Sequence, residues 1–215
     1  MLLSEIEKEL LAAGVSPLCG VDEAGRGPLA GPVCAAAVIL PEGLVIDGLR
    51  DSKQLSEKRR EALYAVIAEK AVSWSVSFAS VEEIEALNIL GATYLAMNRA
   101  IAGLKRTPAL ALIDGNRNAG IESPSQCVVR GDAQCLCIAA ASVMAKVTRD
   151  RLMRTLARQY PMYGFEQNKG YGTRAHYEAL LACGPCAVHR PSFLRTLRER
   201  AGALAKGGEH EAATL

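Results

Sequence analysis

The sequence predicts an α/β domain with a helical C-terminal part, and three observations support that prediction. Segments of strand character are interleaved with helical patterns as far as residue 130, and only helical patterns follow. Hydrophobic residues make up 50% and charged residues 22% of the chain, which is typical of globular proteins and excludes wholesale disorder. The 215 residues are enough to bury a core without disulfides, so we expect the seven cysteines to be reduced thiols.

The predicted elements alternate along the chain. Strands are expected at residues 18–22, 33–40, 72–78, 109–113 and 126–130. The strand at 33–40 is apolar throughout, and the strand at 72–78 alternates apolar residues with serine. Helices are expected at residues 2–13, 57–71, 81–104, 133–160, 173–182 and 191–201. Ser80 and Glu83 form a capping-box pattern, and the helix after it is expected to break near Asn88. A loop rich in Gly and Tyr is expected at 161–172, and a frayed tail at 206–215.

Charge is distributed unevenly along the chain. Residues 140–215 carry 12 Lys and Arg against six Asp and Glu, whereas the residues before them carry 13 against 17. A basic part can meet a polyanion while an acidic part binds metal, although a scattered, solvated surface has the same composition. No apolar run is longer than the eight residues 33–40, and Glu5 and Glu7 stand where a signal peptide is basic. We therefore expect a cytoplasmic protein that does not contact a membrane.

Acidic side chains follow the ends of three predicted strands. Asp22 and Glu23 end the first strand, Asp114 ends the fourth, and Asp132 follows the fifth just after Gly131. Ligands bind at the carboxyl ends of strands in open α/β sheets, so we expect the four carboxylates to converge. Oxygen ligands select Mg²⁺ or Mn²⁺, and two such ions form the clamp used for in-line phosphoryl displacement.

Each acid taken singly has a simpler explanation. Asp132 is placed to cap the helix after it, Asp114 begins an Asp-Gly-Asn turn, and the first pair could be exposed at a strand end. Four acids at strand ends beside glycines nevertheless favour a metal cluster over four separate coincidences.

Residues 25–30, GRGPLA, match the dinucleotide-binding pattern G-x-G-x-x-A, and Asp47 lies near the expected distance beyond them. That pattern must open a helix, whereas the predicted strand 33–40 follows here, so we reject the binding of a dinucleotide cofactor. The two glycines instead allow the backbone groups of Gly25, Arg26 and Gly27 to approach a sugar hydroxyl.

Cys183 and Cys186 have the spacing of a thioredoxin-type redox pair in Cys-Gly-Pro-Cys. That pair needs a strand before it and a helix after it, and here it follows a predicted helix. We interpret it as the C-terminal turn of that helix. Cys135 and Cys137 lie in a helix expected to be buried, and they do not supply the second pair of a zinc site.

Four residues are candidates for contacts with a nucleic acid. Lys53 lies in a loop before a helix, where it either meets a phosphate or is solvated. Ser142 and Lys146 are one helical turn apart and can face one anion. Tyr171 stands between glycines, where its ring can stack on a sugar or base or simply anchor the loop.

The long helix and two histidines have less specific readings. The predicted long helix carries five cationic residues, which either follow a phosphate backbone or form a solvated face. These residues are Lys146, Arg149, Arg151, Arg154 and Arg158. No Ser, His and Asp relay is evident around His176 and His189, which are more often structural than catalytic in such settings.

Six segments match one family in order over about residues 17–195. They are GVDEAGRGPLAGPV at 20–33, DSKQLS at 51–56, IDGN at 113–116, GD at 131–132 leading into AAASVMAKVTRD at 139–150, KGYGT at 169–173 and HRPSF at 189–193. The chain resembles ribonuclease HII, the type 2 ribonuclease H of bacteria. The resemblance implies a ribonuclease H-like fold, a mixed sheet flanked by helices. It implies a catalytic core at 1–160 and a helical region at 161–205 that completes the substrate cleft.

The resemblance also implies roles for individual residues. The catalytic, metal-binding carboxylates would be Asp22, Glu23, Asp114 and Asp132, with Mg²⁺ or Mn²⁺ as the cofactor. The backbone of Gly25, Arg26 and Gly27 would read the 2′-hydroxyl, which is the group that separates RNA from DNA. Tyr171 would stack on the sugar after the ribonucleotide. Phosphates would be held by Lys53, Ser142 and Lys146, and Lys169 belongs to the same substrate-binding set.

The implied reaction is metal-assisted cleavage of RNA in an RNA–DNA hybrid and 5′ of a single ribonucleotide in duplex DNA. It would leave a 3′-hydroxyl and a 5′-phosphate, and it would serve ribonucleotide and RNA primer removal from DNA. We expect an active monomer, with no partner motif in the tail. The alternatives are a resolvase or type 1 ribonuclease H, which the glycine turn and Tyr171 oppose, and a non-catalytic hybrid-binding protein, which the four carboxylates oppose.

Overall fold

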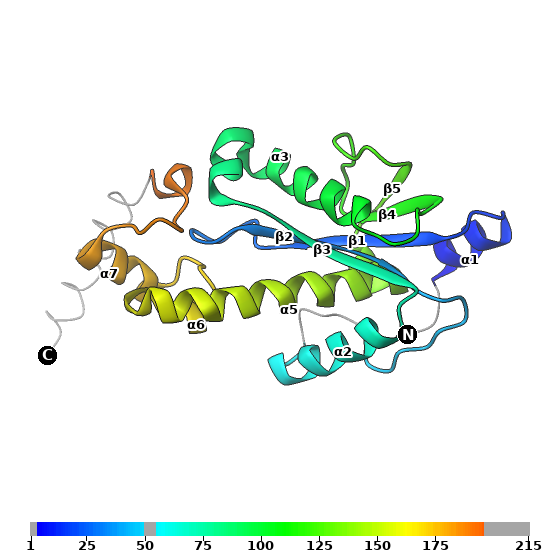
Figure 1. Cartoon of the computed structure of the whole chain (residues 1–215), viewed down its shortest axis with the longest axis horizontal. Helices are drawn as coiled ribbons and strands as arrows, with labels where there is room; N and C mark the ends of the chain where they lie inside the picture. The colour runs from blue at the N-terminus through cyan, green and yellow to red at the C-terminus, as the bar shows by residue number, and fades with distance from the viewer. Residues whose placement is uncertain (1–3, 50–54, 196–215) are drawn as a thin grey trace, which may run out of the picture. The chain divides into compact units, whose positions relative to one another are not determined.

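Figure 1 shows the chain as a computed structural model, which describes residues 4–49 and 55–195. Its contacts divide it into two compact units. The first unit contains the residues up to 26 and residues 32–151, and the second unit contains residues 27–31 and the residues from 152 onward. The division expected from the sequence, into 1–160, 161–205 and a tail, stays a prediction, and the tail lies outside the described residues.

The first unit is built on a mixed sheet, which confirms the predicted α/β class. Its strands are β1 (Leu18–Ala24), β2 (Val33–Ile39), β3 (Ser73–Ala79), β4 (Leu110–Asp114) and β5 (Ser125–Val128). They lie in the order β3-β2-β1-β4-β5. β2 is antiparallel to both β1 and β3, whereas β4 runs parallel to β1, and β5 parallel to β4. The carboxyl ends of β1, β4 and β5 therefore meet at one edge.

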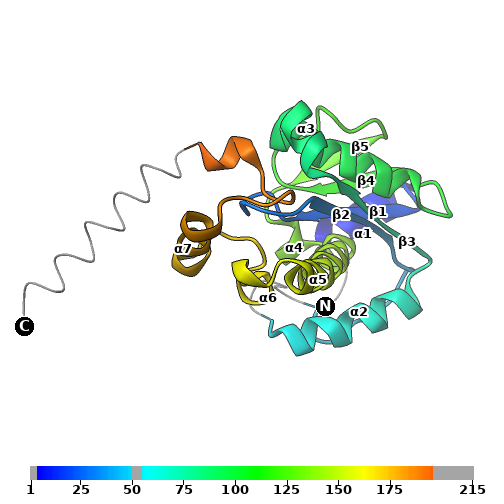
Figure 2. The ribbon, with the colours of Figure 1, turned by 60° about the vertical axis from the view of Figure 1, so that its left-hand side comes forward.

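Helices cover both faces of this sheet (Figures 1 and 2). α3 (Val81–Ala102) lies on one face, and α5 (Leu136–Gln159) lies on the other, with α2 (Glu57–Lys70) beyond it. β2 is buried along its whole length because it faces a helix on each side, and its sequence is accordingly apolar without alternation. Cys34 and Val38 of β2 pack in one cluster with side chains of α2 and α5.

α3 begins and bends where the sequence predicts. The Ser80 hydroxyl accepts the Glu83 N–H, and the Glu83 carboxylate accepts the Ser80 N–H. At Asn88 the backbone leaves the helical region with φ 58°, and the side-chain oxygen of Asn88 accepts the N–H groups of Leu90 and Gly91. The second half of the helix therefore has a cap of its own, which stabilises the break.

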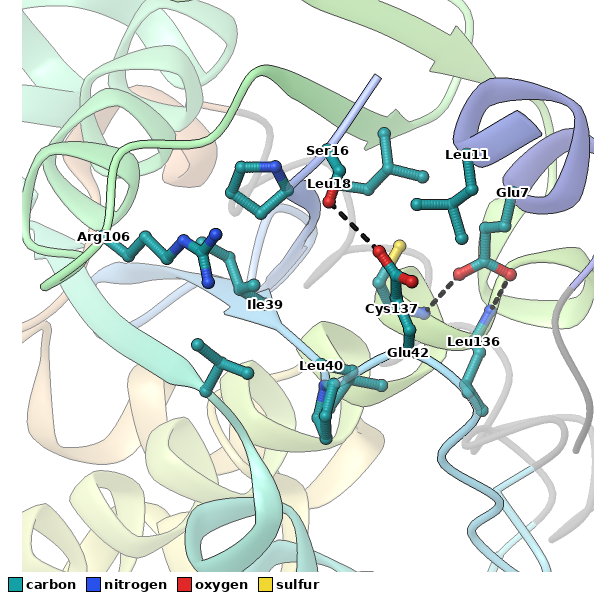
Figure 3. A pocket seen from close by; sticks show the side chains of 13 residues that line it. Glu7, Leu11, Ser16, Leu18, Ile39, Leu40, Glu42, Arg106, Leu136 and Cys137 are labelled. Carbon is teal, nitrogen blue, oxygen red and sulfur yellow. Dashed lines mark hydrogen bonds between the residues drawn. The ribbon is translucent and has the colours of Figure 1, made fainter. Parts of the chain in front are cut away.

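The single long helix predicted after Asp132 is wrong, because two helices occupy that stretch. A short α4 (Gly131–Gln134) ends at Cys135, whose backbone is extended, and α5 starts anew at Leu136. Glu7 of α1 (Glu5–Ala12) reaches this point, and its carboxylate accepts the N–H groups of Leu136 and Cys137 at 2.9 and 3.0 Å (Figure 3). A buried carboxylate from the other end of the sequence thus caps α5, and no local pattern reveals it.

The second unit is helical. After the last residues of α5 it contains η1 (Pro161–Tyr163), α6 (Phe165–Asn168), α7 (Arg174–Cys183) and η2 (Pro191–Leu194). The stretch 161–172, predicted as a loop, contains two short helical turns because Tyr163 and Phe165 are buried in the core of this unit. The helix predicted at 191–201 is a 3₁₀ turn as far as residue 194, and 196–201 lie outside the described residues.

The segment 27–31 is held within the second unit by backbone hydrogen bonds. Leu29 donates to the carbonyl oxygen of Gly170, Gly31 donates to Val188, and Ala30 forms an isolated bridge with His189. A short piece of chain between β1 and β2 therefore belongs to the C-terminal unit. Among the residues that the structure describes, no helix is long and apolar enough to cross a membrane.

Candidate active site

Two of the predicted site residues lie side by side because of the strand order. β1 and β4 are parallel neighbours, and Val21 is paired with Ile113, so Asp22 and Asp114 come next on adjacent strands. One Asp114 carboxylate oxygen accepts the N–H of Gly131 at 2.7 Å. This bond fixes the start of α4 beside β4, directly before Asp132, which is 5% exposed.

The carboxylates of β1 are held in an unfavourable electrostatic environment. Asp22 is 4% exposed, and burial raises its pKa well above the usual range, with repulsion from Glu23 and Asp114 adding to the effect. A hydrogen bond from the Ser142 side chain acts in the opposite direction and lowers the same pKa. Burial also raises the pKa of Glu23, while the Arg26 guanidinium, 3.1 Å from its Oε1, lowers it. Negative charge is therefore concentrated here without full compensation.

The donor set suits a hard divalent cation. Carboxylate oxygens are the ligands that Mg²⁺ and Mn²⁺ prefer, and a cation would relieve the repulsion among Asp22, Glu23 and Asp114. Across residues 4–49 and 55–195, no group of three or more His, Cys, Asp or Glu side chains is already gathered closely enough to hold a metal ion. The expected four-carboxylate metal set, with Asp132 as its fourth member, stays a prediction.

Gly25 and Arg26 follow β1 directly, in a turn that favours glycine at position 25. Gly25 has φ +96°, and a Cβ there would lie 2.0 Å from Nε of Arg149. Arg149 itself is 1% exposed and donates from Nε to the carbonyl oxygen of Pro32. The suggestion that Arg149 follows a phosphate backbone is therefore wrong, because its guanidinium is buried under this turn.

The helix residues predicted to hold phosphates have partners in the structure. Ser142 is 6% exposed and bonds to Asp22, so it lies at the carboxylates. Lys146 forms an ion pair with Asp150 at 2.7 Å.

Arg151, another cationic residue of the helix, pairs with Glu61 and covers the Tyr64 ring, so it belongs to a surface network within the first unit. Lys53 lies outside the described residues.

The predicted residues of the second unit lie in one turn. The Tyr171 side chain is 46% exposed, and its Cε1 lies 3.6 Å from the position of a Cβ at Gly27. Lys169 donates from Nζ to the carbonyl oxygen of Glu166. Gly170 has φ +85° and approaches Ala30 so closely that a Cβ would lie 2.6 Å from its carbonyl oxygen. The structure therefore brings Gly27 and Tyr171 together.

A small cavity in the first unit adds residues that sequence reasoning missed. It measures about 60 Å³, and Glu23, Arg26 and Asp114 line it together with Tyr94 of α3 and Arg117. Arg117 comes directly after the Asp-Gly-Asn turn, which was the only signal available for it. Tyr94 comes from a helix face that no pattern singled out.

A larger cavity of about 320 Å³ is not part of this site (Figure 3). Leu18 and Ile39 line it, together with Arg106. Leu18 begins β1, whereas Asp22 and Glu23 lie toward the end of that strand. The cavity therefore opens at the opposite end of the sheet from the carboxylates.

The cysteines take no part in a disulfide. All seven lie in the described residues and are free thiols, as expected. Cys183 ends α7 and Gly184 caps it, so the Cys-Gly-Pro-Cys sequence is a helix C-terminal turn as predicted. Burial raises the pKa of the Cys186 thiol, which opposes the thiolate that a redox pair needs.

The sheet order and the acids at the ends of β1 and β4 place the chain among the ribonuclease H-like α/β proteins. The crystal structure of the ribonuclease H2 from Pyrococcus horikoshii is similar, with a TM-score of 0.70, 26% identity and coverage of 85% of this chain and 97% of that chain. A crystal structure of Bst-RNase HIII in complex with Mn²⁺ shares the fold, with a TM-score of 0.61, 20% identity and coverage of 78% and 62%.

Sequence comparison narrows this class. The model of the family Ribonuclease HII matches residues 19–196. Ribonuclease HII 1 of Methylibium petroleiphilum is 56% identical over 191 residues, which are 89% of this chain and 94% of that protein. The chain belongs to the ribonuclease HII family. It is a metal-dependent endoribonuclease of the type 2 ribonuclease H class.

Proposed function

We propose that this enzyme cleaves the RNA strand of RNA–DNA hybrids and also nicks duplex DNA on the 5′ side of a single embedded ribonucleotide. The products would be a 3′-hydroxyl and a 5′-phosphate, formed by in-line attack of water. The observation that carries the proposal is the adjacency of Asp22 and Asp114 at the ends of parallel β1 and β4, with Glu23 beside them. Such a cluster of partly uncompensated carboxylates is suited to phosphoryl chemistry at a polyanion only when cations are bound.

Asp22, Glu23, Asp114 and Asp132 would hold the divalent cation, which is Mg²⁺ or Mn²⁺. When bound, the cation supplies activation of a water molecule and stabilisation of charge on the phosphate oxygens. The chain's own groups orient this set. Ser142 donates to Asp22, the Gly131 N–H fixes Asp114, and the Arg26 guanidinium holds the Glu23 carboxylate.

Recognition of the ribonucleotide is proposed to depend on backbone groups and one aromatic ring. The backbone of Gly25, Arg26 and Gly27 would bond to the 2′-hydroxyl, and the left-handed conformation of Gly25 supports a close approach of main chain. Tyr171 would stack on the following sugar and favour a deoxyribose there, which its exposed ring supports. Lys53, Ser142 and Lys146 would hold phosphates, and Lys169 would belong to the same substrate-binding set.

The cellular role would be removal of ribonucleotides and RNA primers from DNA, carried out by a monomer. A cytoplasmic location stays a prediction from the sequence.

A nicking assay tests the proposal. The substrates are a DNA duplex with one ribonucleotide, a continuous RNA–DNA hybrid and an all-DNA duplex, each with Mg²⁺, Mn²⁺ or chelator. We expect a metal-dependent nick directly 5′ of the lone ribonucleotide, and extension of the product by a DNA polymerase would identify its 3′-hydroxyl. Cleavage of the continuous hybrid alone would indicate type 1 specificity and refute the roles given to the glycine turn and Tyr171.

A further inference from the structure

A pair of buried histidines lies in the second unit, and the proposed function does not use it. His176 of α7 is fully buried, and His189 is 3% exposed. Their Nε2 atoms are 3.0 Å apart, which is hydrogen-bond distance. Two facing N–H groups would repel at that distance, so one imidazole must donate and the other must accept.

The two ends of the pair determine which ring donates. The Cys186 backbone N–H donates to Nδ1 of His189 at 3.0 Å, so that nitrogen has no proton and neutral His189 is protonated on Nε2. His176 therefore accepts on Nε2 and is protonated on Nδ1. Its Nδ1 lies 2.9 Å from the carbonyl oxygen of Tyr171, which can only accept. The hydrogen bonds thus run in one direction, from the Cys186 amide to Tyr171.

The surroundings keep both rings neutral and fixed. Burial lowers the pKa of His176, and burial together with the neighbouring His176 lowers the pKa of His189 to about 4. The Tyr163 ring meets His189 edge-on with centroids 4.7 Å apart, and Phe165 meets His176 edge-on at 5.5 Å. The Tyr163 phenol and the Cys186 thiol are also titratable, and burial raises the pKa of both. The Tyr163 ring contacts both imidazoles, and the Cys186 thiol lies 3.2 Å from Nδ1 of His189.

This chain of hydrogen bonds ends at the backbone of Tyr171, whose ring is exposed. The Tyr171 N–H donates to Asn168, and its carbonyl oxygen accepts from both Thr173 N–H and His176. The backbone of Tyr171 is therefore held at both of its polar groups, while its ring stays accessible beside Gly27.

We propose that His176 and His189 are positioning residues, which orient the Tyr171 ring for stacking on the sugar after the ribonucleotide. They would set the preference for a ribonucleotide–deoxyribonucleotide junction and leave the cleavage step itself unchanged. This inference rests on the proposed role of Tyr171, and it adds a specificity device built from a directional hydrogen-bond chain.

The test compares variants by the ratio of kcat/KM on the single-ribonucleotide duplex to kcat/KM on the continuous hybrid. His176→Phe keeps an aromatic ring but removes the bond to Tyr171, and we expect the ratio to fall about fivefold, the scale of one buried hydrogen bond. His176→Asn, whose amide N–H can replace Nδ1–H, should retain most of the ratio. Phe165→Leu perturbs the same core without removing a hydrogen bond, and it should leave the ratio unchanged.

A double-mutant cycle separates this inference from the proposed function. If His176 acts through Tyr171, His176→Phe should not lower the ratio further in a Tyr171→Ala background. A ratio lost in Tyr171→Ala but unchanged in His176→Phe would refute the histidine role and leave the proposed function standing. An unchanged ratio in Tyr171→Ala would refute the Tyr171 role and the specificity device with it. If Phe165→Leu lowers the ratio as much as His176→Phe does, the loss comes from disturbed packing and the histidine role is refuted.

Imidazole ¹⁵N NMR gives a readout that does not depend on activity. We expect His176 to be protonated on Nδ1 and His189 on Nε2 at pH 7, with both titrating below the usual range. The opposite tautomer on either ring, or a charged imidazole at pH 7, would overturn the inference.

Discussion

In the first unit, Asp22 is buried and Glu23 is partly buried beside Asp114, and burial raises the pKa of each of the first two, with repulsion from neighbouring acids adding to the effect. In the second unit, His176 and His189 are buried as well, but their pKa values are lowered and each ring nitrogen has a partner. Both regions therefore hold titratable side chains away from water. They differ in whether hydrogen bonds and charges of the protein itself compensate the loss of water.

The difference indicates what each region is for. A buried charge without full compensation is tolerated where a ligand, here a divalent cation, completes the site. A network in which every donor and acceptor is satisfied rigidifies its surroundings and suits a scaffold. Substitutions in the first region should therefore change activity more than stability, and substitutions in the second should change specificity and stability.

The largest effect is expected for Asp22→Asn. Cleavage should fall by at least about a hundredfold, because loss of one metal-binding carboxylate removes several kcal/mol of charge stabilisation. Stability without metal should not fall, since burial and neighbouring acids already disfavour the charge. Single-turnover cleavage and thermal unfolding measure the two quantities. Exposed Asp47→Asn is the control, and turnover equal to that control would exclude Asp22 from the metal set.

Gly25→Ala tests how rigidly the turn beside the carboxylates is built. The new Cβ would lie 2.0 Å from Nε of Arg149, and the backbone has φ +96°, so we expect a loss of roughly 1–3 kcal/mol in unfolding free energy. Gly14→Ala is the matched control, because Gly14 has φ +79° and nothing within 4 Å of its Cβ position. Urea unfolding of both should give the larger loss for Gly25→Ala. Equal losses would mean that the Arg149 contact adds nothing to the backbone strain.

Glu7→Gln tests a buried carboxylate of the first unit whose charge the protein does compensate. Glu7 is a buried carboxylate like Asp22, but it accepts N–H groups from Ser4, Leu136 and Cys137. Replacing one acceptor oxygen by an NH₂ group should lower the unfolding free energy by about 1–2 kcal/mol and leave cleavage unchanged. The exposed Glu9→Gln should change stability by less than about 0.5 kcal/mol. No loss in Glu7→Gln would contradict the capping role at α5.

The two regions should also differ in how their stability depends on pH. The folded-state pKa of His189 is about 4, below its ordinary value, so the unfolded chain takes up the proton first as the pH falls. The histidine contribution is therefore complete above about pH 6.5 and is lost progressively toward pH 4. The raised pKa values of Asp22 and Glu23 act in the opposite direction, because their protonation is favoured in the folded state.

Urea midpoints at several pH values isolate the histidine term. The difference in stability between the wild type and His189→Phe should shrink as the pH falls from 7 to 5. A constant difference would show that the pair does not titrate more readily in the unfolded chain.

The sequence predicted the elements whose causes are local. The alternation of serine with apolar residues in β3, the unbroken apolar run of β2 and the capping box at Ser80 all lie within a few residues, and each element was found. The break at Asn88 was predicted for the same reason, since the side chain caps the helix that it interrupts. The acids at strand ends were also evident, because their spacing along the chain follows the strands.

What the sequence missed depends on contacts between distant residues. Glu7 interrupts a continuous helical pattern by capping α5 at Leu136, and Arg149 is buried under a turn that begins more than a hundred residues earlier. A helical periodicity does not reveal either partner. The two short helices in 161–172 were missed because burial of Tyr163 and Phe165 outweighs the loop character of the neighbouring glycines.

The sequence alone therefore predicted the succession of strands and longer helices along the chain, the family resemblance and the acids at the strand ends, because propensity, capping and motif spacing are properties of neighbouring residues. The tertiary structure decided that Asp22 and Asp114 are adjacent, since only the parallel pairing of β1 with β4 brings their strand ends together. It also decided that His176 and His189 belong to one chain of hydrogen bonds that all run in the same direction. That direction depends on the backbone groups at the two ends, the Cys186 N–H and the Tyr171 carbonyl.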